Sequence, residues 1–115
     1  MFDLAGKSVW VAGHNGMVGA AVVRRLVDEA CRVITVDRKA VDLRDQAAVA
    51  AFVAREKPDA VVLAAAKVGG ILANDTYPAD FLYDNLAIEA NLIKACQLAG
   101  VAKVLFLGSS CIYPK

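Results

Sequence analysis

Short apolar runs alternate along this chain with longer segments whose apolar residues recur at helical spacing. Four runs rich in Val, Ile and Leu are too short for helices and lack polar alternation: residues 8–12, 32–36, 60–64 and 103–107. Such runs are typical of strands buried on both faces, as in a parallel sheet. The segments between them carry their apolar residues on one stripe and predict three helices, over residues 17–30, 46–56 and 78–99.

Residues that commonly begin or end helices flank two of these segments. Asp45 suits the N-terminal cap of the second helix, Pro78 the first turn of the third, and Gly100 its C-terminal end. The resulting order β-α-β-α-β-α-β predicts parallel β-α-β units with right-handed crossovers. We therefore expect an α/β fold, a Rossmann-type doubly wound parallel sheet in three layers. The expected strand order is 3-2-1-4, with the fourth strand at an edge.

Composition narrows the class of protein. The 115 residues are 58% hydrophobic and carry 13 basic and 12 acidic side chains, for a net charge of +1. This predicts one folded domain over residues 1–115, the N-terminal part of a larger α/β fold, and argues against disorder. A net charge this close to zero gives no positive field that would attract nucleic acid. No run reaches the ~18–20 apolar residues that span a membrane. Neither nucleic acid nor a membrane is therefore expected as a partner.

The cysteines bear on location and metal binding. Cys31, Cys96 and Cys111 are odd in number and widely spaced, which predicts neither a disulfide framework nor a metal site. A reducing, cytoplasmic setting is the expectation.

A glycine-rich turn follows the first predicted strand and opens the first predicted helix. Its spacing is G-x-x-G-x-x-G, with Gly13 for a tight turn, Gly16 for close approach of a pyrophosphate and Gly19 for helix–strand packing. The helix N-terminus would offer free amides to the phosphates. The whole turn is therefore a candidate dinucleotide site: Gly13, His14, Asn15, Gly16, Met17, Val18 and Gly19. The alternative is a tight turn without a ligand.

Residues after the second predicted strand bear on the cofactor. Asp37 lies 18 positions after Gly19, where a carboxylate can bond the ribose hydroxyls of NAD(H). Arg38 follows it and could instead pair with the 2′-phosphate of NADP(H). Asp42 and Leu43 are expected near the adenine. Both cofactors therefore stay open at this point.

Polar residues also follow the fourth predicted strand. Ligands of such sheets bind outside the carboxyl ends of the strands, which favours a position over the cofactor for the hydroxyls of Ser109 and Ser110 and the thiol of Cys111. Ser109 could bond a substrate carbonyl, and Cys111 could act as an acid or base. Alternatively, the serines satisfy backbone groups and the cysteine is a small apolar filler.

Four segments resemble one family: GHNGMVG, LAAAKVGGI, NDTYPADFLYDN and FLGSSCIYPK. Together they are similar to the GDP-L-fucose synthase family, the NADP-dependent epimerase/reductases of the extended short-chain dehydrogenases. The resemblance covers nearly the whole chain. It implies a GDP-sugar substrate, NADP(H), and conversion of GDP-4-dehydro-6-deoxy-D-mannose to GDP-L-fucose. A homodimer is expected for the full-length protein.

The resemblance assigns roles to particular residues. It places the phosphate loop on Gly13 to Gly19, an adenosine-side arginine on Arg38 within residues 38–43, and a further cofactor segment on residues 107–110. Ser109 matches the serine that binds and polarises the sugar. Cys111 matches the cysteine that acts as a base in the epimerisations.

Two departures from the family pattern matter. Asn15 replaces an arginine that helps to hold the 2′-phosphate, and Asp37 would repel that phosphate, so NAD(H) stays open. The family's Tyr-x-x-x-Lys pair has no counterpart in this chain, and the 115 residues alone are therefore expected to be inactive. The alternatives are a non-catalytic dinucleotide-binding module and another nucleotide-sugar epimerase or dehydratase.

Overall fold

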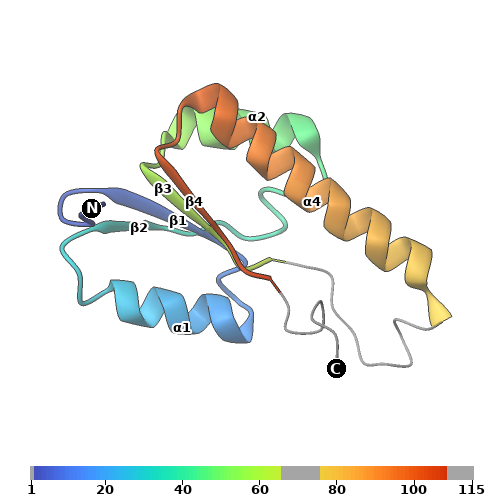
Figure 1. The fold of residues 1–115 in the computed structure, drawn as a ribbon, viewed down its shortest axis with the longest axis horizontal. Helices are drawn as coiled ribbons and strands as arrows, with labels where there is room; N and C mark the ends of the chain where they lie inside the picture. The colour runs from blue at the N-terminus through green and yellow to red at the C-terminus, as the bar shows by residue number, and fades with distance from the viewer. Residues whose placement is uncertain (1, 66–75, 109–115) are drawn as a thin grey trace.

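A parallel sheet between two layers of helices forms the computed structural model, which describes residues 2–65 and 76–108 (Figure 1). Its elements in chain order are β1 (Ser8–Ala12), α1 (Met17–Leu26), β2 (Arg32–Ile34), α2 (Gln46–Glu56), β3 (Ala60–Leu63), α4 (Pro78–Ala99) and β4 (Lys103–Phe106). The predicted α/β class and the alternation of strands and helices are confirmed.

The strand order differs from the prediction. The sheet runs β2-β1-β3-β4 and every pairing is parallel, with Trp10 opposite Ile34 on one side and Val61 on the other. The expected order 3-2-1-4 is wrong, because β3 pairs with β1 rather than with β2. Figure 1 shows the reason: α1 covers one face of the sheet, and α2 and α4 cover the other. Right-handed crossovers on opposite faces run in opposite directions, so the α2 connection passes back over β1.

Side chains of the strands alternate between two cores. On the α2/α4 face, Trp10 is fully buried and meets Phe52 edge-on, with ring centroids 4.8 Å apart. On the α1 face, Val9 and Val11 pack with Leu26. Both faces of β1 and β3 are therefore apolar, which explains why their sequences lack polar alternation.

The element ends follow local chemistry. The Asp45 carboxylate accepts a hydrogen bond from the Ala48 amide at 3.1 Å and caps α2. Gly100 ends α4 in the left-handed region, at φ 72°. α1 ends at Leu26 rather than at residue 30, because the amide of Glu29 bonds the Leu26 carbonyl in a tighter i to i+3 turn. The strands are likewise one or two residues shorter than predicted where they end at Ile34, Leu63 and Phe106.

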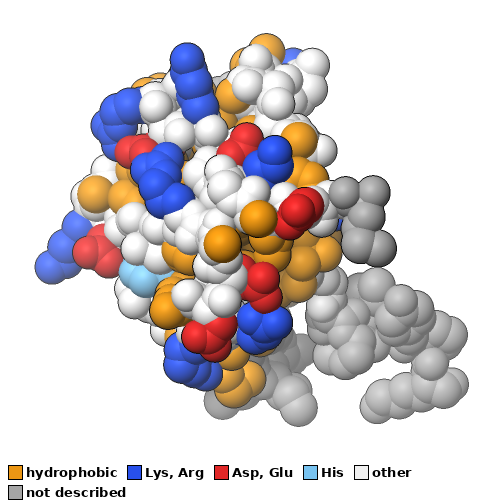
Figure 2. Space-filling model, turned by 90° about the vertical axis from the view of Figure 1, so that its left-hand side faces the viewer, with side chains coloured by type: hydrophobic (Ala, Val, Ile, Leu, Met, Phe, Trp, Pro, Cys, Tyr) orange, Lys and Arg blue, Asp and Glu red, His pale blue; other side chains and the backbone are white. Residues whose placement is uncertain are grey.

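The fourth strand is an edge of the described sheet, as expected. Its apolar side chains are exposed, with Leu105 at 52% and Phe106 at 47%, although the sequence is that of an interior strand. Acidic and basic side chains are interspersed over the face shown in Figure 2, in keeping with the net charge of +1. No helix in the described ranges is long and apolar enough to cross a membrane.

Candidate functional site

A cavity of about 540 Å³ opens at the carboxyl end of β1, beside the glycine turn. Its walls come from the first turn of α1, the segment after β2, the two residues after β3, and Asp84 and Ile88 of α4. β1 has β2 on one side and β3 on the other. The cavity therefore lies where successive crossovers diverge, which is where open parallel sheets bind ligands.

The three glycines of the turn differ in whether the fold itself requires a residue without a side chain. Gly13 has φ +91°, and a Cβ there would lie 2.6 Å from the Ala65 nitrogen. A Cβ on Gly19 would lie 1.9 Å from the Gly13 carbonyl oxygen. The fold itself thus requires Gly13 and Gly19. Gly16 is different, because its φ of −75° suits any residue and its Cβ would lie 3.5 Å from the nearest atom, an ordinary contact.

The N-terminus of α1 opens onto this cavity. Gly16 is its N-cap and provides no side-chain hydrogen bond, and no acidic residue lies in the first turn. First-turn amides have no partners within a helix, and the helix dipole places partial positive charge at that end. This end of α1 can therefore receive an anion such as a phosphate.

The segment after β2 forms the rim of the cavity. Arg38 lines it. The Asp37 carboxylate is 74% exposed and lies 3.5 Å from Nε2 of His14, whose side chain is 20% exposed. His14 is thus a neighbour of the predicted ribose-binding carboxylate.

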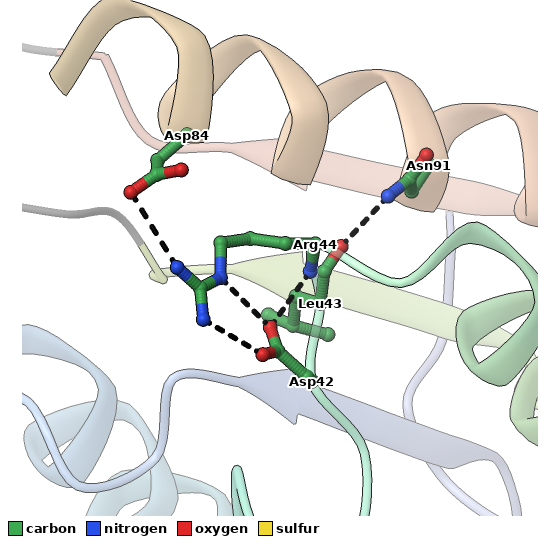
Figure 3. Close-up of polar contacts among 5 residues, drawn as sticks. All are labelled: Asp42, Leu43, Arg44, Asp84 and Asn91. Carbon is green, nitrogen blue, oxygen red and sulfur yellow. Dashed lines mark hydrogen bonds and ion pairs between the residues drawn. The ribbon is translucent and has the colours of Figure 1, made fainter. Parts of the chain in front are cut away.

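Farther along this segment, Asp42, Arg44 and Asp84 form one polar cluster (Figure 3). Asp42 Oδ1 accepts from the Arg44 amide and Nε at 3.0 and 3.1 Å, and Oδ2 accepts from Nη2 at 2.9 Å. Nη1 of Arg44 lies 3.6 Å from Asp84 Oδ2. Hydrogen bonds from the Arg44 side chain and amide lower the pKa of Asp42 to about 2, and Asp42 raises the pKa of Arg44.

The structure brings most of the predicted cofactor residues together. Those that line the cavity are Gly13, His14, Asn15, Gly16, Met17, Val18, Arg38, Asp42 and Leu43. Leu107 and Gly108 do not line it, since β4 is separated from β1 by β3. Ser109, Ser110 and Cys111 lie outside the described residues. Over residues 2–65 and 76–108, no cluster of three or more His, Cys, Asp or Glu is placed to hold a metal ion.

Two charged residues of the cavity lining, Arg44 and Asp84, were not predicted from the sequence. Arg44 follows Asp42 by two positions, a local spacing that could have suggested a pair. Asp84 belongs to α4, far along the chain, and no pattern connects it with the β2–α2 segment.

Residues 9–115 match the NAD dependent epimerase/dehydratase family. The chain belongs to that family. Membership is consistent with a glycine turn and an open helix N-terminus beside a cavity, the features with which parallel sheets bind dinucleotides.

Among relatives in this epimerase/dehydratase family, the chain is 61% identical over 115 residues to GDP-L-fucose synthase of Sinorhizobium fredii, covering 100% of this chain and 37% of that protein. It is 53% identical over 110 residues to GDP-L-fucose synthase of Escherichia coli, covering 95% and 34%. The chain thus spans about a third of the length of the curated relatives it matches. The resemblance inferred from the motifs is confirmed.

Solved structures of similar proteins agree in fold. DdhaC has a TM-score of 0.91 at 46% identity, over 100% of this chain and 33% of its own. The GDP-mannoheptose C4 reductase from Campylobacter jejuni with NADP bound has a TM-score of 0.89 at 37% identity, over 99% and 34%.

Proposed function

We propose that this chain is the cofactor-binding part of a GDP-L-fucose synthase, an epimerase/reductase that converts GDP-4-dehydro-6-deoxy-D-mannose to GDP-L-fucose. The observation that carries the proposal is 61% identity to a GDP-L-fucose synthase along the whole chain. In this reaction two ring carbons beside the ketone are epimerised, and the ketone is then reduced.

The described residues fit a dinucleotide. The N-terminus of α1, without a side-chain cap, and the absence of a side chain at Gly16 suit the pyrophosphate. Arg38 and the segment from Val41 to Leu43 suit the adenosine half. When bound, NADPH supplies the hydride for reduction of the ketone.

We propose NADPH as the cofactor, with Arg38 as the partner of the 2′-phosphate. Arg44 is paired with two carboxylates, whereas Arg38 is the other arginine of the described cavity lining and is the better candidate to attract a phosphate. The NADP bound in the Campylobacter jejuni reductase, at a TM-score of 0.89, supports this choice. Asp37 opposes it, and a strong preference for NADH would assign the selection to Asp37 instead.

The chemical groups of the reaction are assigned by sequence match. Ser109 would bind and polarise the sugar and Cys111 would act as a base, as part of GSSCIYPK. We further propose that the full-length protein is a cytoplasmic homodimer. Residues 1–115 bind the cofactor without turning over substrate, because no Tyr is followed four positions later by Lys.

A chimera tests the function. Residues 1–115 replace the matching segment of the Escherichia coli GDP-L-fucose synthase, and the keto-sugar is supplied with NADPH. We expect loss of NADPH absorbance together with formation of GDP-L-fucose. Cys111→Ala in the chimera should abolish epimerisation and leave some ketone reduction.

The alternative outcomes are distinct. A folded chimera that binds NADPH and consumes none with this sugar would contradict the proposed substrate. If other GDP-keto-sugars were also inert, the non-catalytic binding module would replace the enzyme. Titration of the 115-residue chain with NADPH and NADH decides the cofactor separately.

A further inference from the structure

Arg44 connects the wall of the cofactor cavity to helix α4 (Figure 3). Its guanidinium bonds Asp42 through Nε and Nη2 and faces Asp84 of α4 through Nη1 at 3.6 Å. All three side chains line the cavity. A planar guanidinium can hold one carboxylate in a two-bond fork while a remaining N–H points elsewhere, which an ammonium group cannot do.

A second bond ties the same segment to the same helix. Nδ2 of Asn91 donates to the Leu43 carbonyl at 3.0 Å. Asp84 and Asn91 are seven residues apart on α4, so they lie on one face of the helix two turns apart. Both the side chain of Arg44 and the backbone of Leu43 are thereby fixed to a rigid element.

The charges argue against a phosphate contact for Arg44. One guanidinium between two carboxylates leaves the cluster with a formal charge of −1. Its donors toward Asp42 are already used in a fork, and the Asp84 side chain is only 13% exposed. Because its guanidinium already faces two carboxylates, Arg44 is better suited to hold the cavity wall in place than to bind a phosphate.

We propose that Arg44 is a positioning residue for the adenosine half of the cofactor, acting by fixing the wall formed by Val41, Asp42 and Leu43 to α4. This inference rests on the proposed dinucleotide function. Without Arg44, the segment between β2 and α2 loses one of its two contacts with α4 and keeps the bond from Asn91, so the base loses part of a preformed surface. Preformed sites bind more tightly because less ordering accompanies binding.

Binding of two cofactors tests this role. NADPH and NADH are titrated by calorimetry into the 115-residue chain and into Arg44→Gln, Arg44→Lys and Asp84→Asn. The matched control is Arg25→Gln on α1, which removes an exposed pair with Glu29 in the turn after that helix. We expect Arg44→Gln to raise both Kd values by about tenfold, the effect of losing charge-assisted hydrogen bonds, with their ratio unchanged.

The other variants make the result specific. Arg44→Lys should recover part of the affinity, Asp84→Asn should weaken both cofactors less than Arg44→Gln does, and Arg25→Gln should change neither. A changed NADPH-to-NADH ratio in Arg44→Gln would make Arg44 a phosphate ligand and overturn the proposal. Unchanged affinity for both cofactors would overturn it too.

A measurement without cofactor separates this inference from the proposed function. The Asp45 amide bonds the Asp42 carbonyl at 2.9 Å, and its hydrogen exchange reports how firmly the segment is held. We expect Arg44→Gln and Asn91→Ala to accelerate exchange there, while α1 amides stay protected. If the wild-type chain binds neither cofactor, the proposed function is contradicted. If hydrogen exchange is unchanged in both variants, the proposal that Arg44 and Asn91 hold this segment against α4 is contradicted.

Discussion

Replacing Gly16 with alanine separates what the fold needs from what a ligand needs. The backbone at Gly16 has φ −75° and ψ 168°, which alanine adopts freely. Its new Cβ would lie 3.5 Å from the Gly13 carbonyl oxygen, within ordinary contact distance. Lower entropy of the unfolded chain and the poorer capping of alanine nearly cancel, so we expect a stability change within about 0.5 kcal/mol.

The same methyl group stands where a pyrophosphate would approach the first turn of α1. It displaces the phosphate from the amides, so we expect NADPH binding to weaken at least tenfold, about 1.4 kcal/mol. Urea unfolding of the free chain and calorimetric titration with NADPH measure the two effects separately.

Gly19→Ala is the matched control. Its Cβ would lie 1.9 Å from the Gly13 carbonyl oxygen, so the turn must move before the helix can pack. We expect a loss of about 3 kcal/mol or more in the free energy of unfolding, through overpacking. Wild-type NADPH affinity in Gly16→Ala would refute the reasoning, because the phosphates would then bind elsewhere.

Three further predictions concern stability and reactivity. The pKa of Asp42 falls to about 2 on folding, so its contribution is fully present above the ordinary carboxyl pKa and is lost as the pH falls from about 4 toward 2. Urea midpoints should fall less in Asp42→Asn than in wild type across that window; equal losses would contradict the pairing with Arg44. Asp45→Ala should cost about 1 kcal/mol by removing the cap on the Ala48 amide, whereas Asp45→Asn should retain most of it in thermal unfolding. Burial raises the pKa of the Cys96 thiol to about 11, so alkylation at pH 8 followed by peptide mapping should leave it unmodified until urea is added, and rapid labelling of the native chain would count against its burial.

The elements themselves could be predicted because they depend on local pattern. Apolar runs without polar alternation predicted the strands. Asp45 predicted the start of α2, and Gly100 predicted the end of α4. Helix α1 was predicted too long, since a segment that continues the helical pattern can still tighten into a turn after Leu26. The glycine turn was likewise predictable, because its glycines recur at a fixed spacing between a predicted strand and a predicted helix.

The strand order could not be read in the same way. Its outcome depends on which face of the sheet each helix covers, and an amphipathic stripe does not specify that face. Only packing decided that α1 covers one face of the sheet while α2 and α4 share the other, with Leu92 in the core on that second face. The change of face between α1 and α2 put β3 beside β1, and the shared face of α2 and α4 placed β4 beyond β3, away from the cavity.

By itself, the sequence of this protein determined a parallel α/β fold, a glycine-rich turn between the first strand and the first helix, and membership of the NAD dependent epimerase/dehydratase family. The tertiary structure decided the strand order, the different duties of Gly16 and Gly19, and the cluster of Asp42, Arg44 and Asp84. The physical reason is the sequence distance over which each interaction acts. Periodicity, caps and turns depend on residues a few positions apart. The direction of a crossover and a contact between distant segments are set only when the helices pack against one face of the sheet or the other.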